Sequence, residues 1–300
     1  MTGKRTTRHD PVSHLRAAPG GAMSYKNAPT QSVSVGGTRF AYRDLGKDAG
    51  VPVIFLNHLA ANLDNWDPRV VDGIAAKHRV ITFDNRGLGA SQGTTPDTVE
   101  AMARDAVAFI RALGFDQVDL LGFSLGGFVA QVIAQQEPAL VRKLILAGTG
   151  PAGGEGIVNV TKLTYLDTFH AFATFKDPKE LLFFTRTDHG RSEAKAFIKR
   201  LKERTTDRDK ATTIRAFRTQ LKAIHSWGLE KPADLSGIHQ PVLVANGDDD
   251  RMVPTTNSFD LARRLPNATL RIYPDAGHGG IFQAHDRFVP EALAFLGSSN

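Results

Sequence analysis

The chain has 300 residues, of which 41% are hydrophobic and 23% charged, and its formal net charge is +6. This composition is close to that of average globular proteins and excludes collagen, a coiled coil and an extensively disordered chain. The absence of cysteine excludes disulfides, thiolate metal sites and cysteine nucleophiles. No run approaches the roughly 18 apolar residues of a membrane-spanning helix, so we predict no membrane association.

The positive charge lies in two segments. Residues 1–22 are basic and lack the apolar stretch of a secretory signal, which predicts a disordered extension on a cytoplasmic protein. Residues 151–232 hold 16 basic and 10 acidic residues. Within them, Ser192–Thr205 has an apolar stripe opposite its lysines, as is typical of a surface helix. We therefore interpret these charges as a solvated face and predict no nucleic-acid partner.

The predicted elements alternate between strands and helices along the chain. Residues 32–43 alternate around Gly36-Gly37, which predicts a β-hairpin. Asp97 begins a predicted helix with the capping-box string DTVE, and Gly114 ends it. Six apolar runs are continuous enough for strands buried on both faces: Val53–Leu56, Val80–Phe83, Val118–Leu121, Leu144–Ala147, Val242–Ala245 and Leu270–Tyr273. The α/β alternation predicts a mostly parallel central sheet with helices on both faces.

One segment interrupts this alternation. Residues 151–232 contain charged helical patterning and several phenylalanines but no comparable apolar strand. We therefore predict a core formed by residues 23–150 and 233–300, with an inserted helical cap, or lid, at residues 151–232. Phe169 and Phe172 share one predicted helical face, which forms either the core of the cap or the roof of an apolar substrate pocket.

Two strings match GxSxG, at Gly89–Gly93 and at Gly122–Gly126. A nucleophile elbow requires a buried strand that runs into the serine and a helix that leaves from it. Ser124 has both neighbours, the strand QVDLLG and the helical pattern SLGGFVAQVIAQQE. Ser91 follows a loop and is separated from the next helix by GTTP. Ser124 is therefore the predicted nucleophile and Ser91 a turn residue.

A serine nucleophile needs a base, and the base needs an orienting acid. Asp250 and His278 each follow a predicted strand, at the sheet edge where open α/β folds place their sites. Asp248 and Asp249 directly precede Asp250, so neighbouring carboxylates compete for the role of the acid. Three consecutive carboxylates also suggest a metal site, but no histidine lies nearby in sequence, and we predict no metal.

Together these motifs resemble the α/β-hydrolase fold family, over roughly residues 32–297. The family pattern GxxDxxVP matches Gly247–Pro254, GH matches Gly277-His278, and DxRGxGxS matches Asp84–Ser91. The resemblance implies an α/β-hydrolase fold and a catalytic triad of Ser124, His278 and Asp250 that works without a cofactor.

The oxyanion hole of such an enzyme needs two backbone N–H groups. Leu125, directly after the nucleophile, supplies one by position. Most family members carry His-Gly in the loop that supplies the other. Here Asn57-His58 occupies that position, and Leu59 is the predicted second donor.

The Asn-x-Leu start of this loop, followed by a tryptophan, resembles the 3-oxoadipate enol-lactonases. The rest of the chain also looks like cofactor-free haloperoxidases and perhydrolases. His58 is a candidate substrate contact, with a loop-structuring role as the alternative. The full set of candidate pocket residues is His58, Trp66, Phe123, Phe169 and Phe172.

The expected function is hydrolysis of a small-molecule carboxylic ester or lactone through an acyl-enzyme. Two alternatives use the same triad: a haloperoxidase or perhydrolase, and a C–C bond hydrolase. A third alternative is a nonenzymatic binding protein with the same fold. The string GTGPAG at Gly148–Gly153 raises a dinucleotide-dependent oxidoreductase as another. Pro151 and the glycines after it interrupt the helix that phosphates would need, and we interpret the string as a flexible entry to the cap.

Overall fold

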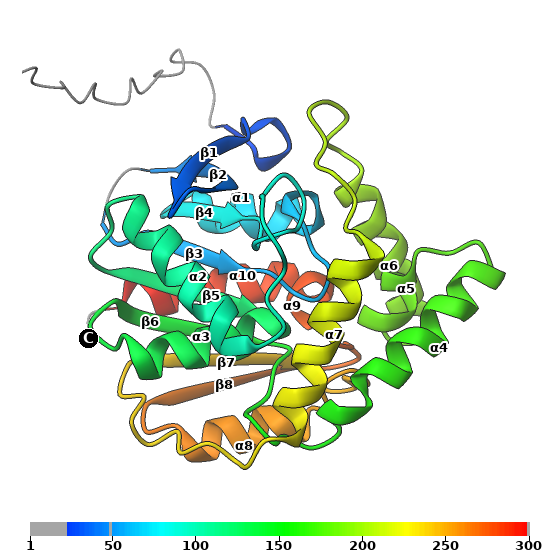
Figure 1. The fold of residues 1–300 in the computed structure, drawn as a ribbon. Coiled ribbons are helices and arrows are strands. Elements are labelled where there is room, and N and C mark those ends of the chain that lie inside the picture. The colour runs from blue at the N-terminus through cyan, green and yellow to red at the C-terminus, as the bar shows by residue number, and fades with distance from the viewer. Residues whose placement is uncertain (1–22, 48–49, 299–300) are drawn as a thin grey trace, which may run out of the picture.

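The computed structural model describes residues 23–47 and 50–298, so the predicted extension at 1–22 lies outside the described residues. Eight strands form one sheet in the order β1-β2-β4-β3-β5-β6-β7-β8 (Figure 1). The strands are β1 (Gln31–Val35), β2 (Thr38–Gly46), β3 (Val53–Leu56), β4 (Arg79–Phe83), β5 (Val118–Phe123), β6 (Val141–Ala147), β7 (Val242–Gly247) and β8 (Ala268–Tyr273).

The first two strands form the predicted hairpin, and β2 also pairs antiparallel with β4. All other neighbouring strands are parallel, which confirms the mostly parallel sheet. The hairpin turn places Gly36 and Gly37 at φ +56° and +80°. Both angles lie in the left-handed region that a two-residue hairpin turn of type I′ requires, and glycine adopts it without a steric penalty.

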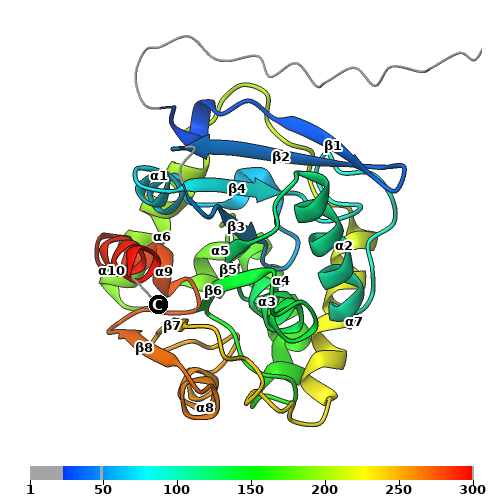
Figure 2. The same cartoon turned by 90° about the vertical axis from the view of Figure 1, so that its left-hand side faces the viewer.

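Helices cover both faces of the sheet, as Figure 2 shows. The helices of the core are α1 (Pro68–Ala75), α2 (Val99–Ala112), α3 (Leu125–Gln136), α8 (Thr256–Arg264), α9 (Gly280–Gln283) and α10 (His285–Gly297), with short 3₁₀ turns η1 (Tyr25–Asn27) and η2 (Leu63–Asn65). Helices α2, α3 and α8 pack into one apolar cluster, and α1, α9 and α10 pack into the other.

The strand side chains alternate between these two clusters, which explains the continuous apolar runs. In β3, Ile54 and Leu56 belong to the first cluster, whereas Val53 and Phe55 belong to the second. Because both faces are covered, most positions in such a strand are apolar. Strand β8 is the exception, since this edge strand exposes Thr269 and other alternate positions, and the predicted burial on both faces is wrong there.

Helix α2 begins one residue later than predicted. Thr98 is its N-cap, and its hydroxyl accepts a hydrogen bond from the backbone N–H of Ala101 at 3.2 Å. Asp97 instead pairs with Lys222 of the cap at 2.6 Å. A threonine cap satisfies an N–H at the third helical position as well as an aspartate would, so the adjacent carboxylate is free to face the cap.

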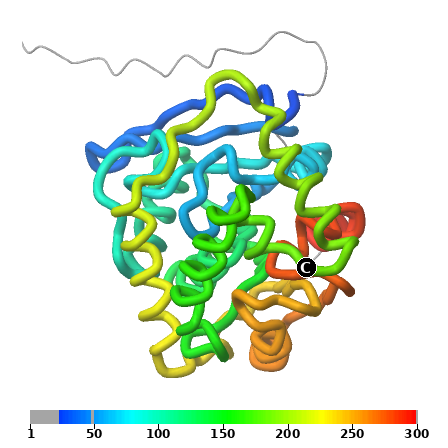
Figure 3. The backbone as a smooth tube through the Cα atoms, turned by 90° about the vertical axis from the view of Figure 1, so that its right-hand side faces the viewer, coloured from blue at the N-terminus to red at the C-terminus, as the bar shows by residue number. Residues whose placement is uncertain are grey.

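The segment between β6 and β7 is helical and lies on one side of the core, facing the viewer in Figure 3. It comprises η3 (Ile157–Asn159), α4 (Val160–Ala173), α5 (Pro178–Phe183), α6 (Asp188–Leu201) and α7 (Ile214–Leu229). On α6, Phe197 and its apolar neighbours are buried, whereas Lys195 and Lys199 are exposed. Within the described ranges no helix is long and apolar enough to cross a membrane.

Buried ionic contacts join this cap to the core. Arg200 of α6 donates two hydrogen bonds to Asp67 Oδ2, at 2.8 and 2.9 Å, and Asp67 also caps α1.

A second contact between cap and core joins two carboxyl groups beside Gly89. A Cβ placed on Gly89 would lie 2.3 Å from Asp84 Oδ2 and 2.4 Å from Asp209 Oδ2. Glycine therefore leaves room for a core carboxyl group and a cap carboxyl group to meet. Burial, together with Asp209, raises the pKa of Asp84 well above its ordinary value.

Candidate active site

Ser124 lies in a sharp turn between β5 and α3. Its backbone has φ +57° and ψ −117°, a conformation that residues with a side chain rarely adopt and that costs on the order of 1–3 kcal/mol. The flanking glycines make the turn possible. A Cβ on Gly122 would lie 2.4 Å from the carbonyl oxygen of Gly126, and one on Gly126 would lie 1.9 Å from that of Leu56. The chain therefore bends tightly enough to hold the hydroxyl at the end of the strand.

The three predicted side chains form one hydrogen-bonded chain. His278 Nε2 lies 3.0 Å from Ser124 Oγ, and His278 Nδ1 lies 2.8 Å from Asp250 Oδ2. Ser124 follows β5, Asp250 follows β7 and His278 follows β8, so the carboxyl ends of parallel strands bring together residues far apart in sequence. In this geometry the hydroxyl donates to the imidazole, and the imidazole donates to the carboxylate.

The neighbouring carboxylates point in different directions. Asp250 Oδ1 accepts hydrogen bonds from the backbone N–H groups of Met252 and Val253, at 2.8 and 2.9 Å, which leaves Oδ2 for His278. Asp248 Oδ1 instead accepts from the backbone of Ala276, and Asp249 is exposed. Within residues 23–47 and 50–298, no three acidic or histidine side chains are grouped so that they could hold a metal ion.

Two backbone N–H groups near Ser124 have no acceptor among the described residues. They belong to Leu59 and to Leu125, the first residue of α3. The loop that carries Leu59 is held on both sides. Asn57 donates to the carbonyl of Phe83 and accepts from Trp66 Nε1, while Gln220 of α7 accepts from the backbone N–H of Ala60 at 2.7 Å. Two unpaired backbone N–H groups of this kind are what an oxyanion hole requires.

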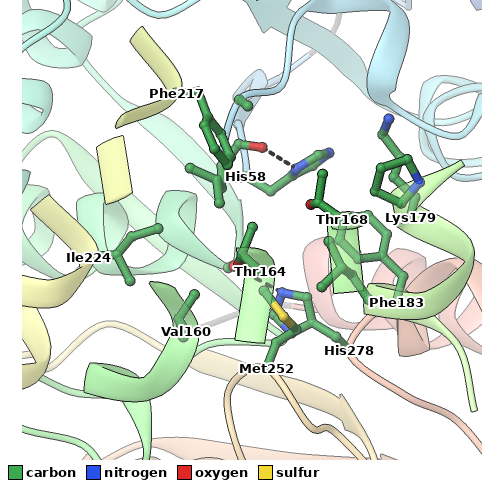
Figure 4. A pocket seen from close by; sticks show the side chains of 15 residues that line it. His58, Val160, Thr164, Thr168, Lys179, Phe183, Phe217, Ile224, Met252 and His278 are labelled. Carbon is green, nitrogen blue, oxygen red and sulfur yellow. Dashed lines mark hydrogen bonds between the residues drawn. The ribbon is translucent and has the colours of Figure 1, made fainter. Parts of the chain in front are cut away.

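A cavity of about 230 Å³ opens beside Ser124 and His278 (Figure 4). Its walls come from the loop after β3, from α4 and α5, and from α7. Most of the lining is apolar, and the residues concerned are Leu59, Ala60, Val160, Pro178, Leu182, Phe183, Phe217, Ile224 and Met252. The polar lining residues besides Ser124 and His278 are His58, Thr164, Thr168 and Lys179.

His58 lines this cavity as predicted, but the other four candidate pocket residues do not line it. Phe169 and Phe172 are 74% and 82% exposed, so their predicted place in the pocket is wrong. They lie on the outer face of α4, and the inner face is formed by Val160, Thr164 and Thr168 at a spacing of four residues. The two phenylalanines do share one helical face, and that face is turned toward water.

Trp66 and Phe123 lie behind the cavity wall, and their predicted place in the lining of the pocket is also wrong. Both are fully buried, with Trp66 packed edge-on against Phe55 and with Phe123 against His278 at a centroid distance of 5.0 Å. The indole N–H of Trp66 is used up by Asn57, 2.6 Å away. These rings support the site from beneath and leave no face toward a ligand.

The two competing motifs have structural roles. Ser91 Oγ accepts from the backbone N–H of Ala41 and donates to the carbonyl of Asp84, so its hydroxyl is occupied in a buried turn. Gly148–Gly153 forms a loop after β6, and the next helical turn begins only at Ile157. No helix N-terminus follows this glycine string directly, and a phosphate-binding geometry is missing there.

Sequence reasoning missed most of the apolar lining and also four polar residues at the site: Thr164, Thr168, Lys179 and Gln220. The first two could have been found from the i, i+4 spacing after Val160 on a predicted helix. Lys179 and Gln220 carried no signal, because their position depends on how the cap packs onto the core. A further contact of this kind is the hydrogen bond from the backbone N–H of Gly279 to the carbonyl of Phe183, at 2.7 Å, which fixes α5 beside His278.

Comparisons with known proteins agree with this geometry. Residues 51–284 match the family model described as alpha/beta hydrolase fold. The chain belongs to the α/β-hydrolase fold family. The solved structure of an alpha/beta hydrolase fold protein from Chitinophaga pinensis is 42% identical with a TM-score of 0.87, and the match covers 92% of this chain and 100% of that one.

Two curated relatives of this hydrolase family carry different activities in their names. A protein of Caulobacter sp. (strain K31) that is named as a carbamate hydrolase is 32% identical, with 77% of this chain and 85% of that protein covered. A non-heme chloroperoxidase of Streptomyces lividans is 29% identical, with 87% of this chain and 97% of that protein covered. The family and its fold are therefore established, but the relatives are named for different reactions.

Proposed function

We propose that the protein is a serine hydrolase that cleaves a small carboxylic ester or lactone through an acyl-enzyme, without a cofactor. The observation that carries this proposal is the continuous hydrogen-bonded chain Ser124–His278–Asp250, of which Ser124 and His278 line the cavity. Nucleophile, base and orienting acid within hydrogen-bond reach of one another are the arrangement that acyl transfer needs.

The first half of the reaction forms the acyl-enzyme. Ser124 Oγ attacks the substrate carbonyl carbon while His278 Nε2 takes the hydroxyl proton, and Asp250 stabilises the resulting imidazolium. The N–H groups of Leu59 and Leu125 donate to the carbonyl oxygen as it becomes negative. When the tetrahedral intermediate collapses, His278 gives its proton to the leaving alkoxide. In a lactone the leaving group stays attached as a hydroxyl on the acyl chain.

The second half repeats these steps with water. His278 takes a proton from the water as it attacks the acyl-enzyme, the same N–H groups stabilise the oxyanion, and Ser124 leaves with the proton from the imidazole. The mostly apolar cavity of about 230 Å³ favours a small, largely apolar acyl group. Pockets for drug-sized ligands are larger, roughly 300–1,000 Å³.

Covalent labelling tests the proposal directly. A fluorophosphonate probe should label the protein at Ser124, and labelling and ester hydrolysis should both disappear in Ser124→Ala. Ser91→Ala is the matched control, because the other GxSxG serine is occupied by backbone hydrogen bonds. It should keep labelling and most of the activity per folded molecule. Labelling that survives in Ser124→Ala would contradict the assignment of the nucleophile.

Perhydrolysis is a second candidate, favoured by the chloroperoxidase relative. Hydrogen peroxide would replace water in the second half, so that the acyl-enzyme releases a peracid and Ser124 is restored. With an excess of peroxide over a carboxylic ester, the peracid yield should be compared with that of free acid. A peracid yield no higher than that of the uncatalysed reaction would leave hydrolysis as the proposed activity.

A further inference from the structure

His58 has one ring nitrogen bound and one without a partner, although the residue is almost completely buried. Nδ1 lies 2.9 Å from the carbonyl oxygen of Leu59, and because a carbonyl only accepts, Nδ1 carries the proton. Nε2 has no hydrogen-bond partner among the described residues, and the side chain is 4% exposed. Figure 4 shows the ring with this bond on one side and the other nitrogen across the ring.

The protonation state makes Nε2 an acceptor. Burial, together with the nearby ammonium of Lys179, lowers the pKa of His58 to about 3, so the imidazole is neutral at physiological pH. A neutral imidazole protonated on Nδ1 has a lone pair on Nε2 and no proton to give there. His58, a residue that lines the cavity, therefore carries a buried acceptor, and the backbone of Asn65, whose nearby carbonyl raises the pKa of His58 as that of Leu59 does, cannot satisfy it, because a carbonyl only accepts.

The place of His58 connects this acceptor to the reacting groups. His58 and His278 both contact Phe123, with ring centroids 5.4 and 5.0 Å apart, and both contact Phe183, at 5.1 and 5.5 Å. The two imidazoles thus contact the same pair of phenyl rings, and both histidines line the same cavity. Leu59, whose N–H is proposed to hold the oxyanion, is the next residue.

A purely structural role for His58 does not explain why its Nε2 is a polar atom without a partner. The bond from Nδ1 to Leu59 fixes the ring, but packing between two phenyl rings would be served equally by an apolar side chain. Burying a polar atom without a partner is unfavourable, so an unpartnered atom beside a binding cavity needs an explanation, and a ligand group that completes its hydrogen bond supplies one. Thr164 Oγ1, in the wall contributed by α4, also lacks a partner.

We infer that His58 Nε2 accepts a hydrogen bond from the substrate, which is therefore an ester or lactone that carries an O–H or N–H donor close to its scissile carbonyl. This inference rests on the proposed function and narrows the substrate class. The donor replaces the water that Nε2 loses on burial, and an analogue in which that proton is replaced by methyl leaves the buried acceptor unsatisfied.

Two matched substrate pairs test this inference and separate the two kinds of donor. The hydroxyl pair is phenyl 3-hydroxybutanoate and phenyl 3-methoxybutanoate, and the amide pair is the phenyl esters of N-acetylglycine and N-acetyl-N-methylglycine. In at least one pair we expect kcat/KM to be about 10- to 100-fold higher for the donor. The pair that shows the preference identifies the donor as O–H or N–H.

Variants assign the preference to His58. His58→Phe keeps a planar ring but removes the acceptor, and should bring the ratio close to 1. His58→Gln can place an amide oxygen near the position of Nε2 and should restore much of the ratio. His225→Phe, the same substitution at an exposed cap histidine, should retain the full ratio. Ratios near 1 in both pairs, or a ratio that His58→Phe leaves unchanged, would overturn the inference without affecting the proposed hydrolase.

A spectroscopic measurement is independent of turnover. In the ¹⁵N-labelled Ser124→Ala protein, long-range proton–nitrogen correlations should show His58 Nε2 unprotonated and Nδ1 protonated between pH 5 and pH 8. A proton on Nε2 in this range would make that nitrogen a donor and would overturn the inference, even if none of the four esters is hydrolysed. Failure of the proposed function, in contrast, would appear as absent labelling of Ser124.

Discussion

Each oxygen of the Asp250 carboxylate has a separate task. Oδ1 accepts from two backbone N–H groups, which fixes the side chain in the loop after β7, and Oδ2 faces the imidazole of His278. An amide in this place would keep the first contact, because its oxygen also accepts. Its nitrogen would then face Nδ1 as a donor, and the imidazole could bind it only in the tautomer that removes the lone pair from Nε2.

Asp250→Asn should therefore leave the fold intact while kcat falls on the order of 10³–10⁴-fold. The matched control is Asp249→Asn, one residue earlier, whose carboxylate is exposed and should be dispensable. Initial rates on a p-nitrophenyl ester, with circular dichroism to verify folding, provide the comparison. Similar losses in the two variants would mean that a different residue orients the base.

At the scale of elements, helix α7 of the cap holds the loop that carries Leu59. Ala60 in this loop has φ +57°, an unfavourable angle for alanine, and Gln220 accepts its N–H. Thr212, just before α7, donates to the carbonyl of the same residue at 2.7 Å. The cap thus does more than cover the cavity, because it holds the backbone next to Leu59, the residue proposed as an oxyanion donor.

Gln220→Leu should lower kcat by roughly tenfold with a smaller change in KM, because an oxyanion donor acts mainly in the transition state. Gln135→Leu, a similar change at an exposed glutamine on α3, serves as the control. Steady-state kinetics on one ester are sufficient. If KM rises while kcat stays constant, Gln220 contributes to substrate binding and not to the oxyanion hole.

The contact between Asp84 and Asp209 makes the junction of cap and core sensitive to pH. The pKa of Asp84 is raised in the folded protein, so the folded state holds a proton that the unfolded state releases at lower pH. The stability from this contact is complete below the unfolded pKa of about 4 and is lost as pH rises through the folded pKa.

Asp209→Asn removes one of the two carboxyl groups and should raise Tm relative to the parent at pH 8 more than at pH 5. The difference should be about 2–4 °C, which corresponds to roughly 1 kcal/mol in a chain of this size. Thermal melts at the two pH values provide the measurement, and Asp207→Asn, two residues away on the exposed side, is the control. An equal shift at both pH values would contradict a shared proton.

For the whole molecule, the sequence predicted those features that depend only on residues close together in the chain. The buried strands, the elbow at Ser124 and the strand ends at Asp250 and His278 depend on residues next to one another in sequence. The inner wall of the cap could not be predicted in this way, since either face of α4 could have packed inward. Phenylalanine suggested the wrong one, because hydrophobicity alone does not distinguish a core-facing stripe from an exposed one.

The exposed aromatic face of α4 is therefore expected to contribute little to folding. Phe172→Ser should change the free energy of unfolding by no more than about 0.5 kcal/mol and should reduce binding of a hydrophobic dye. Phe197→Ser, at a residue of α6 that is 0% exposed, should destabilise the protein strongly or prevent folding. Denaturant melts distinguish the two, and a large loss of stability in Phe172→Ser would show that this face is covered in solution.

The division of α4 into two faces has a consequence for protein engineering. Val160, Thr164 and Thr168 meet the cavity from a helix whose opposite side is exposed at Phe169 and Phe172. A library restricted to the codons of these three residues would therefore sample new pocket shapes. It would leave the elbow unchanged, including its glycines, where an added Cβ would collide with a backbone oxygen. We therefore expect that a few substitutions on this one helix can change which substrates the cavity accepts.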